Sequence, residues 1–282
     1  MLIAAACCAV VLIVLTGVFV RTSSGQRLDD AALRGQVVQH ALTAHRSDQL
    51  LRTISVGSLA FFGISLVGIA AARGRWLLAV GVGAVIVGSN ATTQIYKHFV
   101  HRPDLIDGVN NLIPFNTLPS GHSTVAASLA AALVLVAPVR LRPWAATLGA
   151  LYACGMAAMT LAAGWHRPSD AVSAFAVVGI WTFGVSAVLV ANRGTGSPRV
   201  HEGLPGLVVG MVAAMTVAFA VILVSTTLDT ADGFRAVRLG VAYVVALGWI
   251  VVTGVAFIVA EVLLLRGVSL DVPSRELASN WT

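Results

Sequence analysis

The chain has 282 residues, of which 57% are hydrophobic and only 11% are charged, and its formal net charge is +6. This composition excludes an ordinary soluble domain, in which about a quarter of the residues are charged. The basic residues lie singly or in pairs at the ends of apolar runs, so no nucleic acid partner is expected. The three cysteines all fall inside apolar runs and predict neither a disulfide framework nor a metal site.

Eight apolar runs predict helices that span a membrane. A spanning helix needs about 20 residues, and the runs lack the alternation of barrel strands. The sequence therefore predicts an all-α, polytopic transmembrane helical bundle. The runs cover residues 1–20, 54–72, 76–96, 122–139, 144–163, 169–191, 204–226 and 239–265.

The first run resembles a signal peptide in position only. It lacks a positively charged start, its apolar stretch is too long, and no clear cleavage site follows, so we expect an uncleaved anchor. The polar connection 21–53 then places apolar residues at near-helical spacing. Part of it is predicted to lie along the membrane interface as an amphipathic helix, which we interpret as a connection without chemistry.

Arginines in the short connections predict the orientation. Cytoplasmic loops are enriched in basic residues, which places both chain termini in the cytoplasm and makes the protein a multi-pass cell-membrane protein. The outer loops then contain Lys97, Arg102 and Arg167, against the general rule, and binding of an anion is one reason for such charges. The cytoplasmic group comprises 73–75, 140–143, 192–199 and the tail after Arg266, and the outer group comprises 97–121 and 164–168.

The first two outer motifs combine fixed charge with a helix start. Lys97 and Arg102 stand at the end of the third run, where they either bind an anion or extend their charges to the interface. Ser120 is a natural N-cap for the fourth run, Gly121 allows close approach of the backbone to an oxyanion, and His122 can transfer a proton near neutral pH. An ordinary Ser-Gly cap is the alternative interpretation.

The third motif is "GWHRPSD", residues 164–170. Pro168 suits the first position of the sixth helix, which places Asp170 in the first turn and His166 just before it. A carboxylate on one ring nitrogen fixes the tautomer and leaves the other nitrogen as a base or nucleophile. Alternatively, Asp170 simply complements the helix dipole.

The order Lys…Arg-Pro, Pro-Ser-Gly-His and His-x-x-x-Asp, with each motif at the end of a span, resembles the type 2 phosphatidic acid phosphatase (lipid phosphate phosphatase) superfamily. The resemblance covers roughly residues 55–190. It implies hydrolysis of a phosphate ester through a phosphohistidine, without a metal or another cofactor. By this resemblance His166 is the nucleophile, Asp170 orients it, and His122 protonates the leaving oxygen. The phosphoryl oxygens are expected to contact Lys97, Arg102, Ser120 and the Gly121 N–H.

Two arginines of the family pattern are absent. The first motif of the family is K-x6-R-P, but Asp104 and Leu105 occupy its final Arg-Pro positions here. The third motif is S-R-x5-H-x3-D, but Met159 and Thr160 precede His166 at those positions. Arg167, next to the expected nucleophile, is predicted to replace the missing arginine, or else to point to lipid head groups.

These expectations define one overall prediction. Residues 1–191 form a six-span phosphatase-like core, 192–203 a cytoplasmic loop, 204–265 two additional spans and 266–282 a cytoplasmic tail. The protein is expected to dephosphorylate a membrane lipid at the outer face, with phosphatidate, phosphatidylglycerol phosphate or a polyprenyl phosphate or diphosphate as substrate. A phosphotransferase on the same scaffold and a non-catalytic lipid-phosphate binding or transport protein are the alternatives. The excess of arginine over lysine points to a GC-rich bacterial genome.

Overall fold

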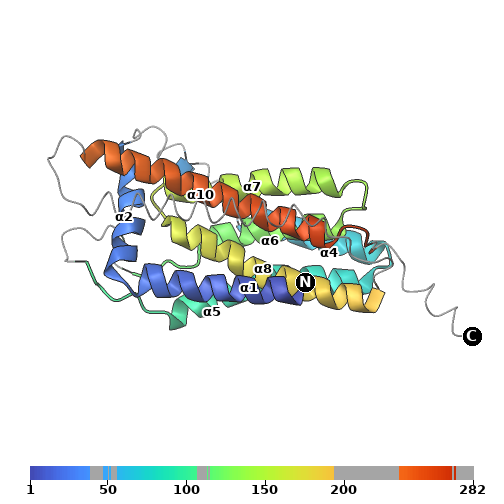
Figure 1. Ribbon diagram of the computed structural model, residues 1–282. Coiled ribbons are helices and arrows are strands. Elements are labelled where there is room, and N and C mark those ends of the chain that lie inside the picture. The colour runs from blue at the N-terminus through green and yellow to red at the C-terminus, as the bar shows by residue number, and fades with distance from the viewer. Residues whose placement is uncertain are drawn as a thin grey trace, which may run out of the picture.

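The computed structural model describes residues 1–38, 47–49, 51, 56–106, 113, 115–193, 235–268 and 270. In these ranges the regular structure is entirely helical (Figure 1). The helices are α1 (Leu2–Leu15), continued by the π-helical η1 (Thr16–Val20), α2 (Ser23–Val38), α4 (Val56–Ala72), α5 (Trp76–Phe99), α6 (Gly121–Val136), α7 (Arg142–Ala162), α8 (Pro168–Arg193) and α10 (Arg235–Leu264). The all-α prediction is confirmed, whereas the run 204–226 lies outside the described residues.

Five helices are long and apolar enough to cross a membrane, so the chain is a multi-pass membrane protein. They are Leu2–Val20, Trp76–Phe99, Arg142–Ala162, Pro168–Asn192 and Val237–Leu264. Two predicted spans, 54–72 and 122–139, correspond to the shorter apolar helices α4 and α6. Large apolar side chains such as Phe61, Trp76 and Trp144 are exposed on the outer surface, as expected of helices that face lipid.

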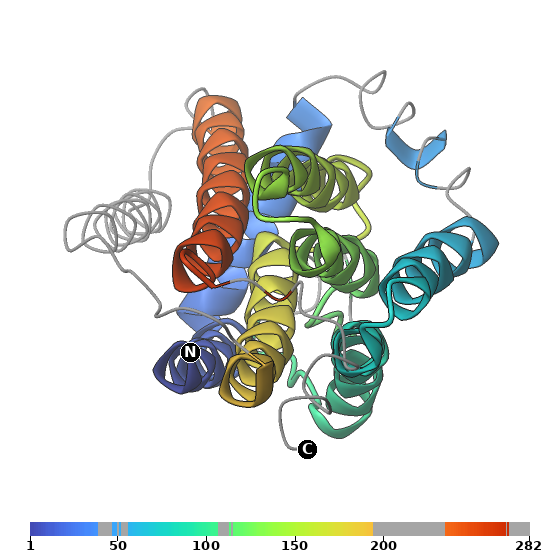
Figure 2. The ribbon, with the colours of Figure 1, turned by 90° about the vertical axis from the view of Figure 1, so that its right-hand side faces the viewer.

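Helix α6 lies inside the bundle, where α4, α5, α7 and α8 pack around it (Figure 2). Its sequence is rich in alanine, and most of its residues are buried. Small side chains permit close helix packing, and a Cβ on Gly149 of α7 would lie only 3.0 Å from the Cβ of Ala130. Helix α1 packs against α8, and α10 packs against α7 and α8.

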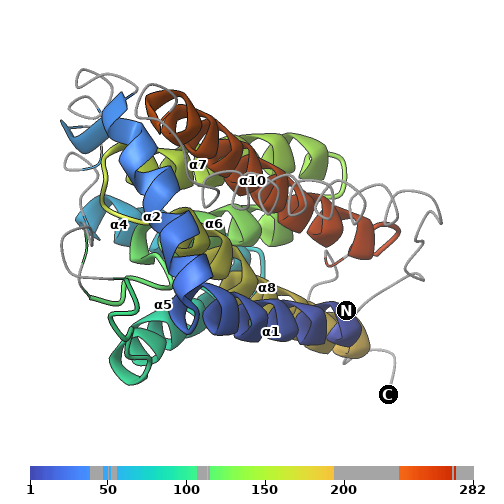
Figure 3. The ribbon, with the colours of Figure 1, turned by 60° about the vertical axis from the view of Figure 1, so that its left-hand side comes forward.

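Helix α2 crosses one end of the bundle instead of running along it (Figures 1 and 3). A helix is thus present over Ser23–Val38, within the predicted connection 21–53, and it buries the apolar residues Leu28, Ala32 and Leu33. It also packs closely on α10, since a Cβ on Gly35 would clash with the carbonyl oxygen of Leu239. The C-terminal helix α10 therefore helps to hold α2 across the bundle end.

At the opposite end, two buried arginines bind the chain that follows α10. Arg75 donates to the carbonyl oxygen of Leu270 over 2.8 and 2.7 Å, and Arg142 donates to those of Leu265 and Val268 over 3.0 and 2.8 Å. The connections before α5 and α7 and the end of α10 thus meet at one end of the bundle, as predicted from their arginines.

Candidate active site

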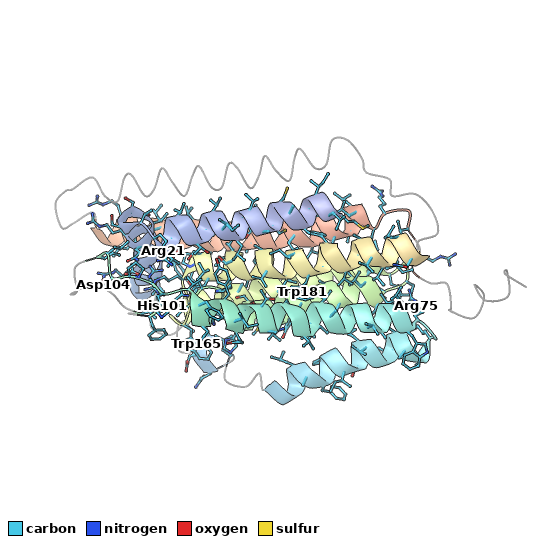
Figure 4. All side chains as sticks on the ribbon, turned by 90° about the horizontal axis from the view of Figure 1, so that it is seen from below. Arg21, Arg75, His101, Asp104, Trp165 and Trp181 are labelled. Carbon is cyan, nitrogen blue, oxygen red and sulfur yellow. The ribbon has the colours of Figure 1, made fainter. Side chains whose placement is uncertain are left out.

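The three motifs of the sequence meet at the bundle end that α2 crosses. Figure 4 shows His101, Asp104 and Trp165 at this end and Arg75 at the other. The backbone N–H of Ser120 donates to the carbonyl oxygen of Asp170 over 2.9 Å, which joins the second motif to the third. The first motif is adjacent, because a Cβ on Gly121 would lie 3.8 Å from Nζ of Lys97.

Ser120 is the N-cap of α6, as predicted. Its side chain accepts a hydrogen bond from the backbone N–H of Ser123 over 3.3 Å, and the Ser123 hydroxyl donates to it over 3.0 Å. The first turn of a helix presents unpaired N–H groups and the positive end of the helix dipole. With the Lys97 ammonium beside Gly121, this helix start is suited to bind an anion.

His166 and Asp170 lie within contact distance. Helix α8 begins at Pro168, as predicted, and Nδ1 of His166 lies 3.2 Å from Oδ2 of Asp170. His166 is 8% exposed and Asp170 is fully buried. Because Nδ1 faces the carboxylate, Nε2 is the ring nitrogen left for chemistry. The ring of His122 lies 6.4 Å from that of His166, measured between centroids, so the two histidines form one group.

The carboxylate of Asp170 has two further donors on the same oxygen. Oδ2 accepts from the Thr117 hydroxyl over 2.5 Å and from the backbone N–H of Arg167 over 2.9 Å. These bonds fix the carboxylate that faces His166. The sequence reasoning missed Thr117, for which the only signal is its place three residues before the Ser120 cap.

Arg102 has a buried guanidinium group that is only partly paired. Its side chain is 2% exposed, and Nη1 lies 4.0 Å from Oδ2 of Asp29 on α2. Its Nε and Nη2 are buried and have no acceptor within the described ranges. Burial lowers the pKa of Arg102 from its ordinary value and Asp29 opposes this change, but a guanidinium stays charged in proteins. Arg102 therefore offers two donors to an anion.

Arg167 points into the protein and not toward the lipid surface. Its side chain is 0% exposed, and its Nε donates to Oδ1 of Asp30 over 2.9 Å. Its Nη2 donates to the carbonyl oxygen of Ile113 over 2.7 Å, and its Nη1 contacts the Thr117 hydroxyl at 3.5 Å. These contacts are all with the protein, and they favour an anchoring role for the Arg167 side chain.

Asp29 and Asp30 are the other residues that the sequence reasoning missed. Asp29 is buried, and it accepts from the Ser169 hydroxyl over 2.5 Å and from the Ser169 N–H over 3.3 Å. Burial raises the pKa of Asp29 to about 7, against the opposing effect of Arg102. The available signal was the adjacent pair of carboxylates beside the apolar residues Leu28 and Ala32, on the buried side of an amphipathic helix.

Among the residues that the structure describes, no group of three or more His, Cys, Asp or Glu side chains is placed to hold a metal ion.

The family model of the PAP2 superfamily matches residues 76–194, which contain α5 to α8 and all three motifs. No curated protein and no solved structure matches the chain significantly. The match confirms the resemblance found in the sequence, and it leaves out α1, α2, α4 and α10.

Proposed function

From the premise that residues 76–194 form a PAP2-superfamily region, we propose that this protein hydrolyses a lipid phosphate or diphosphate through a phosphohistidine on His166. Membership of this superfamily supports a phosphatase acting on a membrane lipid phosphate. The observation that carries the proposal is the contact between Nδ1 of His166 and Asp170, next to His122 and the start of α6.

The reaction has two steps. Nε2 of His166 attacks the phosphorus, the bond from phosphorus to the lipid oxygen breaks, and His122 gives its proton to that oxygen. Water then attacks the phosphohistidine, His122 takes the proton of the water, and the P–N bond breaks to release phosphate. Asp170 keeps the His166 ring in one tautomer and stabilises its positive charge.

Fixed positive groups stabilise the charge on the phosphoryl oxygens. Lys97 and Arg102 provide side-chain donors, while Ser120 and the Gly121 N–H provide the α6 start. Arg167 belongs to the same site. Its backbone N–H binds Asp170 and its side chain binds Asp30, and these contacts support a role in positioning Asp170. No metal or cofactor takes part in this proposal.

The substrate is an amphiphile whose tail stays in the bilayer while its head group reaches the site at the bundle end. Phosphatidate, phosphatidylglycerol phosphate and polyprenyl phosphates or diphosphates all have this form. The arginine-rich connections at the opposite end, with Arg75 and Arg142, favour an orientation in which both termini are cytoplasmic and the site faces outward.

The test is phosphate release by the purified protein in detergent, with this panel of lipid phosphates and with a chelator present. We expect turnover of at least one lipid and its loss in His166→Ala. His101→Ala is the matched control, because His101 is exposed at the same bundle end. Equal turnover by wild type and His166→Ala would refute the mechanism. Product analysis with added alcohol acceptors separates hydrolysis from phosphotransfer.

A further inference from the structure

We propose that Asp29 and Asp30 of α2 are positioning residues for the reaction, each acting through an arginine at the active site. Asp30 acts through Arg167 on Asp170, and Asp29 acts on Arg102 and on the first turn of α8. The inference rests on the proposed function, and it concerns a helix outside the region that the family model matches.

The first connection runs from Asp30 to the nucleophile. Oδ1 of Asp30 binds Nε of Arg167 over 2.9 Å, and the backbone N–H of the same arginine donates to Oδ2 of Asp170 over 2.9 Å. That oxygen also faces Nδ1 of His166 at 3.2 Å. A shift of the Arg167 side chain would therefore move the peptide group that holds the orienting carboxylate.

The second connection runs from Asp29 to the helix start and to the phosphate donors. Asp29 accepts two hydrogen bonds from Ser169, which directly precedes Asp170 in the first turn of α8. Its Oδ2 also lies 4.0 Å from Nη1 of Arg102. The neighbouring carboxylates of α2 thus contact the guanidinium groups of Arg102 and Arg167 and the helix turn that carries Asp170.

The unpaired donors of Arg102 indicate what this arrangement serves. Asp29 approaches only Nη1, while Nε and Nη2 are buried and without an acceptor among the described residues. Buried donors are costly when unpaired, and a phosphoryl oxygen forms strong, charge-assisted hydrogen bonds with a guanidinium. Asp29 therefore orients the guanidinium while leaving two of its nitrogen atoms available for substrate.

Helix α2 is itself firmly placed, so its carboxylates can act as fixed points. Leu28 and Leu33 are buried, and Gly35 packs against the backbone of α10 at Leu239. Gln26, one turn earlier, donates to the carbonyl oxygen of Pro103 over 2.7 Å, next to Arg102. Helix α2 is thus held in place by Gln26 before the two carboxylates and by Gly35 after them.

The experiment compares Asp29→Asn and Asp30→Asn with Asp104→Asn, an exposed aspartate at the same end whose nearest bond is to its own loop. The measurements are kcat and KM for the best lipid substrate, per molecule of monodisperse protein, together with the melting temperature. We expect kcat and kcat/KM to fall together by about tenfold in both variants, because a small misplacement of reacting groups costs that much or more. Asp30→Glu is expected to recover part of the loss.

A double-mutant cycle isolates the path through the arginine. If Asp30 acts through Arg167, Asp30→Asn combined with Arg167→Lys loses little more kcat than the more impaired single variant. Additive losses would refute this path. A lower melting temperature with unchanged kcat per folded molecule would show that the pair is only structural and would overturn the proposal.

His166→Ala and the two aspartate variants distinguish the proposed function from the positioning role. If wild-type turnover does not depend on His166, the proposed function falls and the positioning role falls with it. If turnover depends on His166 but Asp29→Asn and Asp30→Asn match Asp104→Asn, only the positioning role is refuted.

Discussion

The backbone N–H of Ser120 donates to the backbone carbonyl oxygen of Asp170, over 2.9 Å. This single bond joins the N-cap of α6 to the first turn of α8, so the starts of two helices from separate motifs face one another. It places the ring of His122 within 6.4 Å of that of His166. The following predictions depend on this junction and on the groups around it.

Replacing Asp170 by asparagine is expected to lower kcat on the order of a thousandfold, because the neutral amide neither fixes the tautomer of the His166 ring nor stabilises its positive charge. Steady-state phosphate release measures the effect. Ser173→Ala in the same helix is the matched control, since its buried hydroxyl has no partner among the described residues. Similar kcat values for the two variants would contradict the role of Asp170.

Thr117→Val removes one of the three donors to Oδ2 of Asp170 while keeping the side-chain shape. A lost hydrogen bond to a charged group costs about 1.5–3 kcal/mol, so kcat is expected to fall by roughly tenfold or more. Thr117→Ser keeps the hydroxyl and should retain most activity. If the serine variant is as impaired as the valine variant, the hydroxyl is not the group that matters.

Gly121→Ala should impair substrate binding without harming the fold. The added Cβ would lie 3.7 Å from Nε2 of Gln94 and 3.8 Å from Nζ of Lys97, which are ordinary contact distances. It would, however, occupy space beside the Lys97 amine at the start of α6. We expect KM to rise about tenfold with a change of only a few degrees in melting temperature.

Gly155→Ala is the control for this substitution, because a Cβ at Gly155 has no atom within 4 Å. Its KM and melting temperature are expected to match those of the wild type. A large loss of melting temperature in Gly121→Ala, with an unchanged KM, would show that the glycine serves packing and not phosphate binding.

The raised pKa of Asp29 predicts a pH dependence of stability. The pKa is about 7 in the folded chain and 3.8 as the ordinary value, so the folded state binds this proton more tightly than the unfolded state. The resulting stabilisation is fully present below about pH 4 and is lost as the pH rises to about 7. Asp29→Asn lacks this dependence and should gain melting temperature relative to wild type between pH 5 and pH 8.

Melting curves in detergent at pH 5, 6, 7 and 8 provide the measurement. The exposed Asp104→Asn variant is the control. A constant difference between Asp29→Asn and wild type would mean that Asp29 is ionised throughout the range in the folded protein.

Structural features that depend on neighbouring residues in the chain could be predicted from the sequence. Apolar runs predicted every described helix except α2, which followed from apolar spacing in a polar connection. The cap at Ser120 and the helix start at Pro168 followed from local chemistry, and the spacing of His166 and Asp170 placed them one turn apart. The contacts of Asp29 and Asp30 could not be predicted in this way. The amphipathic pattern of α2 indicates which face is buried, but not that α2 crosses the bundle end (Figure 3) or that its carboxylates bind Ser169 and Arg167.

The partner of Arg167 could not be predicted from the sequence either. Its position beside His166 suggested that it replaces the missing arginine of the family pattern, or else that it points to lipid head groups. In the fold its partner is Asp30, on a helix near the N-terminus. A buried charge pairs with an opposite charge that is close in space. The partner of Arg167 therefore depends on where α2 packs, which the local sequence does not indicate.

The position of α2 has a consequence for chimeric proteins. The similarity to the PAP2 superfamily covers residues 76–194. Two residues inside this range depend on α2, which lies outside it: Arg167 is paired with Asp30, and Ser169 is hydrogen-bonded to Asp29. A graft of 76–194 into a relative would separate the buried Arg167 guanidinium from its counter-charge on Asp30. Breaking a buried ion pair typically costs about 3–5 kcal/mol. Domain exchange should therefore carry Ser23–Val38 with the matched region, and with α2 also α10, on which Gly35 rests.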